Sequence, residues 1–128
     1  MDQSNKIQRV EKANKLIKII SLYGRRFFWN KNDNAISFFK IKKGRVYFVD
    51  HYSKKEIYLH YRYWSKGFSN GGTLRSLIDA LKDWIIGKRA NPPLRLLGPW
   101  PKSLCNGDLW GYGSEMKKVR AKGDLLFN

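Results

Sequence analysis

The feature that most constrains this chain is a series of short runs rich in β-branched and aromatic residues, each bounded by turn residues. Runs of this kind predict β-strands. We expect four of them, at residues 25–29, 35–41, 45–50 and 56–64. Lys42, Lys43 and Gly44 form a three-residue connection between the second and third runs, with the glycine in a left-handed conformation. These two runs should therefore pair antiparallel, and the sequence predicts a meander of three or four strands.

Helical periodicity flanks this region on both sides. Apolar residues recur three or four positions apart over residues 7–23, which predicts an amino-terminal helix. The same spacing over residues 74–85 predicts a second, central helix, with Thr73 as its N-cap and its end at Gly87. We expect this central helix to cover the apolar face of the meander.

The carboxy-terminal third of the chain is irregular in pattern. Four prolines and several glycines interrupt residues 91–113, which predicts a loop packed by its own tryptophans and leucines. Ser114 is typical of a helix cap, and we expect a short last helix through Lys122 that ends at Gly123. With 128 residues and no internal repeat, the chain is expected to form a single α+β domain over residues 1–128.

Composition excludes several classes of protein. The hydrophobic fraction of 42% and the aromatic fraction of 15% are too high for a disordered basic tail. No apolar run is long enough to span a membrane, and residues 1–10 lack the apolar core of a secretory signal. We therefore expect a soluble cytoplasmic protein without a membrane partner. The one cysteine, Cys105, excludes an internal disulfide and a zinc site built from several thiolates.

Charge indicates the class of partner. The formal net charge is +16, which disfavours the compact state through self-repulsion but attracts polyanions over long distances. Residues 1–68 hold 16 Lys and Arg against 5 Asp and Glu, whereas residues 69–128 hold 10 against 5. We expect a nucleic acid, DNA or RNA, to bind the amino-terminal half. The alternatives are a gain in solubility alone, an acidic protein surface, anionic lipid or a small phosphorylated ligand.

The fourth predicted strand offers a specific surface. Alternation places Ile57, Leu59, Tyr61 and Tyr63 on one face, whose aliphatic residues belong in the core. The opposite face carries Tyr58, His60, Arg62 and Trp64. Exposed rings and cations on a sheet bind single-stranded nucleic acid, because bases stack on rings and phosphates pair with cations. The alternative is that a helix covers this face and that its aromatic residues are ordinary half-buried ones.

The residues expected to bind nucleic acid are basic or aromatic and lie on or beside the predicted sheet. We expect phosphate contacts from Arg25, Arg26, Lys40, Lys42, Lys43, Arg45 and Arg62, and base stacking on Tyr58 and Trp64. A separate candidate is an anion site ahead of the central helix, where free backbone amides and the helix dipole attract negative charge. Its residues are Gly71, Gly72, Thr73 and Arg75, and the alternative is a tight strand-to-helix turn.

No motif indicates an enzyme. His51 and His60 lack the spacing of a metal site, and residues 71–75 match neither the P-loop nor the dinucleotide fingerprint. A metal-dependent nuclease centre drawn from Asp50 and Glu56 is the alternative. We expect a non-enzymatic protein with no catalytic residue, no metal and no cofactor.

Two stretches punctuated by Gly, Trp and Tyr carry a resemblance to known sequences. Residues 68–75 read Phe-Ser-Asn-Gly-Gly-Thr-Leu-Arg and precede Leu-Lys-Asp-Trp-Ile, and residues 98–101 read Gly-Pro-Trp-Pro and precede Leu-Trp-Gly-Tyr-Gly. Over residues 60–122 the chain resembles short uncharacterised accessory proteins of phages and prophages. The resemblance implies a protein of the host cytoplasm that binds nucleic acid, or that inhibits a host defence complex, as anti-CRISPR proteins do, by binding a host protein or ribonucleoprotein.

Overall fold

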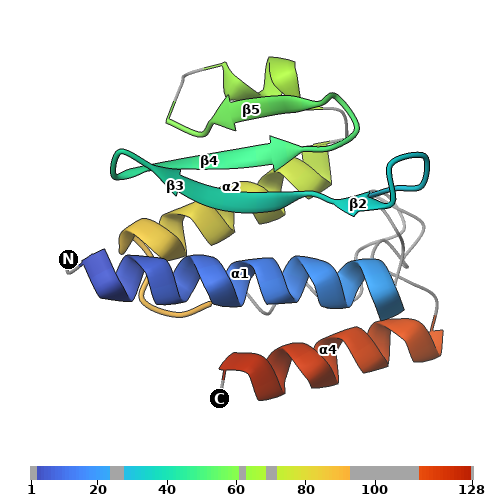
Figure 1. Ribbon diagram of the computed structural model, residues 1–128. Coiled ribbons are helices and arrows are strands. Elements are labelled where there is room, and N and C mark those ends of the chain that lie inside the picture. The colour runs from blue at the N-terminus through green and yellow to red at the C-terminus, as the bar shows by residue number, and fades with distance from the viewer. Residues whose placement is uncertain (1–2, 24–27, 61–62, 69–71, 93–112, 128) are drawn as a thin grey trace.

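The computed structural model describes residues 3–23, 28–60, 63–68, 72–92 and 113–127, and their architecture is α+β, as predicted (Figure 1). The chain begins with helix α1 (Gln3–Tyr23). The strands that follow are β1 (Trp29–Asn30), β2 (Ala35–Ile36), β3 (Phe38–Lys42), β4 (Arg45–Asp50) and β5 (Lys55–Tyr58). After the strands come the 3₁₀ helix η1 (Trp64–Gly67) and the helices α2 (Gly72–Ile86) and α4 (Gly113–Phe127). The expectation of a single domain stays a prediction.

Strands β3, β4 and β5 form the predicted antiparallel meander, in that order. Lys42 pairs with Arg45, so that Lys43 and Gly44 alone make the turn between β3 and β4. Both turn residues have positive φ, 53° and 75°, as a two-residue hairpin of the I′ kind requires. The expected three-residue connection is therefore wrong, although the predicted antiparallel pairing is confirmed.

The second predicted strand, residues 35–41, is divided at Ser37. Its first two residues form β2, which pairs with β1 in a separate two-stranded sheet. The Ser37 N–H donates to the carbonyl oxygen of Phe28 at 2.8 Å, and its buried Oγ accepts from the N–H of His51 at 3.0 Å. Ser37 thus connects the two sheets. Of the first predicted strand, Trp29 lies in β1, while residues 25–27 lie outside the described part of the chain.

The fourth predicted strand, residues 56–64, is too long. β5 ends at Tyr58, and Trp64 begins η1 instead. Trp64 is only 9% exposed, its Nε1–H donates to Asp79 Oδ1 at 3.0 Å, and its ring lies 5.5 Å from that of Phe68. Burial of this ring with a hydrogen-bonded N–H is more favourable than an exposed strand position. Tertiary packing therefore overrides the alternation of the sequence.

The core lies on one face of the meander, where α1 and α2 pack. Phe48 is central, with its ring 6.1, 5.2 and 5.8 Å from the rings of Phe28, Phe39 and Phe68. The same core cluster also includes Val10, Ala13, Leu16, Ile17, Ile20, Val46, Ile57, Leu59, Leu74, Leu77, Ile78, Leu81, Trp84 and Ile85. Both helices share the core with this face, so α2 covers the inner face of the meander together with α1. α1 itself lies between the sheet and α4 (Figure 1).

Asn14 joins α1 to the edge of β3. Its Nδ2 donates to the carbonyl oxygen of Phe39 at 2.9 Å, and its Oδ1 accepts from the N–H of Phe39 at 2.6 Å. These two hydrogen bonds replace those that a further strand would make. The side chain therefore closes an edge that would otherwise be open to pairing with another chain.

The last helix is longer than the predicted segment from Ser114 to Lys122. α4 continues through Gly123, which is buried, and ends at Phe127. The Phe127 ring packs 5.1 Å from that of Trp84, and Val119 is fully buried. Glycine inside a helix costs about 1 kcal/mol relative to alanine. Burial of the apolar residues around it offsets this cost, so the expected end at Gly123 is wrong.

Two other helix starts also differ from the expectations. α1 begins at Gln3 rather than at residue 7, and α2 begins at Gly72, so that Thr73 lies inside the first turn instead of capping it. Most of the predicted irregular segment, including Cys105, lies outside the described residues. Among the helices that are described, none has both the length and the apolar character needed to cross a bilayer.

The hydrogen bonds of Asn14 can be tested by substitution. In Asn14→Ala the N–H and carbonyl of Phe39 lose these partners, so we expect the free energy of unfolding in urea to fall by about 1–3 kcal/mol. Lys12→Ala, on the exposed side of the same helix, is the control and should change it by less than about 0.5 kcal/mol. Equal stability of Asn14→Ala and the wild type would contradict the role of Asn14 at this edge.

Candidate nucleic-acid interface

The face of the meander opposite the core carries the candidate site and is called the outer face below. Strand pairing places on it Phe38, Lys40, Lys42, Arg45, Tyr47, Val49, Glu56 and Tyr58. Lys40, Tyr47 and Tyr58 lie side by side across the three strands. Among the described helices, α1 and α2 both pack with the core side, so the alternative that one of them covers the outer face is not what the structure shows.

Rings and cations lie next to one another on the outer face. The rings of Tyr47 and Tyr58 are 5.2 Å apart and tilted by 33°. The Lys42 ammonium lies 5.9 Å from the centre of the Tyr47 ring, and the Arg45 guanidinium lies 5.6 Å from that of Tyr58. Each such contact contributes about 0.5–1 kcal/mol at an exposed site. The two tyrosines are therefore held beside positive charge.

Lys40 has an acidic partner on the same face. Its Nζ forms an ion pair with Glu56 Oε1. The hydrogen bond from Lys40 lowers the pKa of Glu56 below its ordinary value. Desolvation opposes this effect, and the charges of Lys40 and Lys42 add to it. Glu56 is therefore an anion that neutralises Lys40, whereas Lys42 and Arg45 lie over the rings of Tyr47 and Tyr58.

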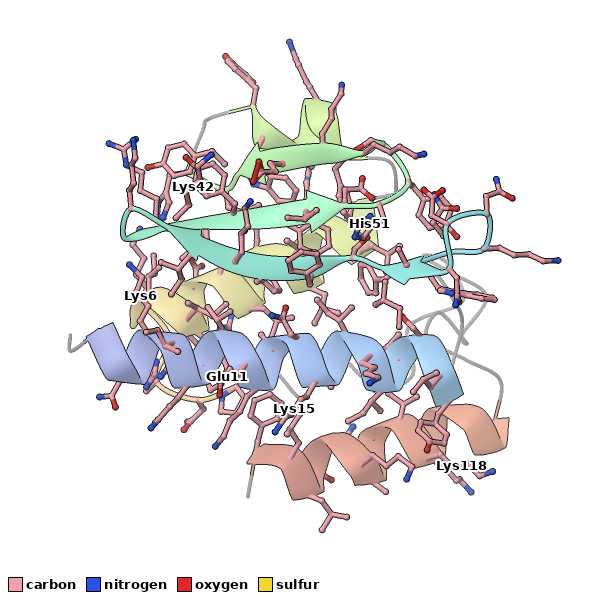
Figure 2. All side chains as sticks on the ribbon, viewed as in Figure 1. Lys6, Glu11, Lys15, Lys42, His51 and Lys118 are labelled. Atoms are coloured by element: carbon pink, nitrogen blue, oxygen red, sulfur yellow. The ribbon has the colours of Figure 1, made fainter. Side chains whose placement is uncertain are left out.

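The amino-terminal end of α1 adds charge beside the β3–β4 turn. Lys6 Nζ donates to the carbonyl oxygen of Gly44 at 2.6 Å. Figure 2 shows Lys6 and Lys42 at the same end of the molecule. A helix that begins the chain thus extends the positive charge of the outer face past the turn.

The surroundings of His60 show that α2 also contributes positive charge at this end of the meander. Its ring lies 5.3 Å from that of Tyr58. Partial burial lowers the pKa of His60 below its ordinary value, and the charges of Lys82, Lys88 and Lys6 lower it further against the opposing charge of Asp83. Cations from both helices therefore act on one imidazole beside the outer face. We call the cations around His60 and the β3–β4 turn the basic zone. Its residues are Lys6, Lys42, Lys43, Arg45, Lys82 and Lys88.

The structure brings together part of the predicted binding set. Lys40, Lys42, Arg45 and Tyr58 share the outer face, and Lys43 lies in the adjoining turn. The expectation that Trp64 lies on this face is wrong, because its ring is buried in the core. Arg25, Arg26 and Arg62 lie outside the described residues.

Sequence reasoning missed Tyr47 and half of the basic zone. Tyr47 had a signal, because alternation along residues 45–50 puts Val46 and Phe48 inward and Tyr47 outward. Lys6, Lys82 and Lys88 had none, because only the tertiary fold brings the two helices to the same end of the meander.

The predicted anion site stays a prediction. Gly71 lies outside the described residues, Gly72 and Thr73 form the start of α2, and Arg75 is exposed in its first turn. The charge of Arg75 also acts on Asp79, one turn further along the helix. Burial raises the pKa of Asp79, whereas Lys82, the hydrogen bond from Trp64 and the charge of Arg75 act against this rise.

The two acidic residues of the alternative nuclease centre lie on opposite faces of the sheet. Asp50 is fully buried, and its carboxylate accepts hydrogen bonds from the N–H of Tyr52 and the Oγ of Ser53, each at 3.1 Å. Glu56 lies on the outer face with Lys40. In the described part of the chain, no three His, Cys, Asp or Glu residues are grouped so that they can hold a metal ion.

The fold and the outer face together define a small basic α+β protein with an aromatic and cationic sheet surface. Residues 3–126 match the model of the YoqU family, and the chain belongs to that family. It is 32% identical over 125 residues to the SPbeta prophage-derived uncharacterized protein YoqU of Bacillus subtilis (strain 168), an alignment that covers 95% of this chain and 83% of the relative. The resemblance to prophage proteins is thereby confirmed. No solved structure matches the chain.

The charge around His60 can be measured by NMR titration. At low salt we expect its pKa to lie below 6.5 and to rise in Lys82→Ala and Lys88→Ala, because each variant removes a nearby positive charge. Added salt should raise it as well, without restoring the ordinary value, since burial remains. Lys118→Ala on α4 is the control and should leave the pKa unchanged. A pKa of 6.5 or more at low salt would contradict the basic zone.

Proposed function

We propose that this protein binds single-stranded nucleic acid, without catalysis, on the outer face and the basic zone. Tyr47 and Tyr58 stack against bases, while Lys42, Lys43 and Arg45 contact phosphates. The observation that carries this proposal is the position of the two tyrosine rings, 5.2 Å apart, each within 6 Å of a cation on the exposed side of the sheet. Successive bases stack on such rings in single-strand binding proteins.

The rings favour a single strand over a duplex. Paired bases hide their faces inside the stack, so a duplex engages the cations but not the tyrosines. A base that stacks on an aromatic ring contributes about 1–3 kcal/mol. Two such rings give a single strand an advantage that phosphate contacts alone do not supply, because the phosphates are present in both forms.

The basic zone sets the expected dependence on salt. Lys82 forms an ion pair with Asp83 and its side chain is only 14% exposed, so the other five cations are the ones counted here. They release counterions when they neutralise phosphates, and for single strands the logarithm of the affinity falls by about 0.7 per phosphate for each tenfold rise in salt. With these five engaged the slope is about −3.5. Binding should therefore weaken by about 10²–10³-fold between roughly 50 and 200 mM salt.

The test is a mobility-shift assay with single-stranded and double-stranded DNA and RNA. We expect Lys42→Glu/Lys43→Glu to weaken binding of the preferred single strand by about tenfold or more, since two phosphate contacts become repulsive. Lys117→Glu/Lys118→Glu is the matched control, because it reverses the charge of another adjacent and exposed pair, on α4 (Figure 2).

Two outcomes of that assay would contradict the proposal. If the two double variants weaken binding equally, net charge alone is responsible and the outer face has no special role. If single and double strands bind with equal affinity and the affinity barely changes with salt, neither the tyrosines nor the basic zone forms a nucleic-acid site.

A second candidate is binding of a host defence protein or ribonucleoprotein. A groove between α1 and α4 gives this candidate a surface of its own. Lysines border it, at Lys15, Lys18 and Lys122, and its apolar lining includes Leu22 and Leu126. Pull-down from nuclease-treated host lysate separates the candidates, because a partner retained equally by the wild type and Lys42→Glu/Lys43→Glu supports a protein-directed role.

A further inference from the structure

A hollow of about 700 Å³ lies beside β5, between that strand and η1. Its lining residues are Tyr47, Lys55, Glu56, Ile57, Tyr58, Tyr63, Trp64 and Gly67. This volume falls within the range of about 300–1,000 Å³ that is typical of sites for small organic groups. We propose that the hollow receives one base of the bound strand together with its sugar. The inference rests on the proposed function and assigns a specific subsite to it.

The walls of the hollow suit a flat aromatic ring. Tyr63 is 59% exposed, and the Lys66 ammonium lies 5.1 Å from the centre of its ring. Trp64 also lines the hollow, and its Nε1–H is already engaged by the hydrogen bond to Asp79. Ile57 completes an apolar wall. A base has two apolar faces and a polar edge, which matches rings and apolar side chains with a few polar groups beside them.

The hollow is continuous with the outer face. Tyr47 and Tyr58 belong to both, and these are the rings beside Lys42 and Arg45. A strand whose phosphates contact those two cations therefore passes the opening of the hollow. The polar groups of its lining are Lys55, a donor, and Glu56, an acceptor, and each suits the hydrogen-bonding edge of a base.

Gly67 allows the hollow to be filled without any change of charge. A Cβ at this position would lie 3.4 Å from Ile57 Cγ1, 3.6 Å from Ile57 Cδ1 and 3.8 Å from Lys55 Cδ, all ordinary van der Waals contacts. A Cβ is thus accommodated at residue 67, and because Gly67 lines the hollow, we expect a larger side chain at this position to enter it. Gly67→Leu therefore blocks the subsite and leaves every cation of the basic zone in place.

The experiment compares two single strands with the same phosphates. One is an oligothymidine of about twelve nucleotides, and the other is an abasic strand of equal length. We expect Gly67→Leu and Tyr63→Ala each to weaken binding of the oligothymidine by about tenfold, the effect of one lost stacking contact, and to leave the abasic strand unaffected. Tyr23→Ala is the matched control, because Tyr23 is also an exposed tyrosine with a lysine, Lys122, over its ring. It should bind both strands as the wild type does.

The outcomes separate this inference from the proposed function. If the wild type binds neither strand, the proposed function fails and the base subsite fails with it. If the wild type prefers the oligothymidine but both variants, shown by urea denaturation to be folded, bind it unchanged, the subsite alone is overturned. Where Gly67→Leu does not fold, Tyr63→Ala decides, since its side chain is mostly exposed and its loss creates no cavity in the core.

Discussion

The packing of Phe48 determines which side of the meander faces solvent. Its ring meets those of Phe28, Phe39 and Phe68, which come from three other segments of the chain. Burial of a phenylalanine contributes about 1.5–3 kcal/mol, and a slip of one residue would turn the whole inner set outward. The outward direction of Tyr47 therefore follows from the core. The hydrogen bonds and the core packing of the sheet are therefore sufficient to orient the side chains of the candidate interface.

The same packing has an electrostatic consequence. α1 is held along β3 by Asn14 and reaches the β3–β4 turn through Lys6. The charges of Lys82 in α2 and of Lys88, just after this helix, act together with Lys6 on His60. Mutual repulsion among these cations opposes folding, and the core must outweigh it. A bound polyanion removes this repulsion. The proposed ligand would therefore stabilise the folded state as well as occupy the surface.

The sequence predicted elements whose pattern coincides with their packing. The strand over residues 45–50 has the predicted bounds because one side of it is buried and the other is not. Alternation in the sequence therefore predicts correctly which of its side chains face the core. The prediction failed where a distant contact overrides a local pattern, as when Asp79 and Phe68 draw Trp64 into the core or burial carries α4 past Gly123. Half of the basic zone belongs to this second kind, since nothing local relates Lys6 to α2.

The central claim is that bases lie against the outer face, and photo-crosslinking tests it most directly. A single strand carrying a photoreactive base is irradiated with the protein, and the modified residues are found by mass spectrometry. The account predicts adducts at Tyr47 and Tyr58, lost when unlabelled single strand is added in excess. Adducts confined to α4 or to the far side of α1, with both tyrosines unmodified, would contradict it.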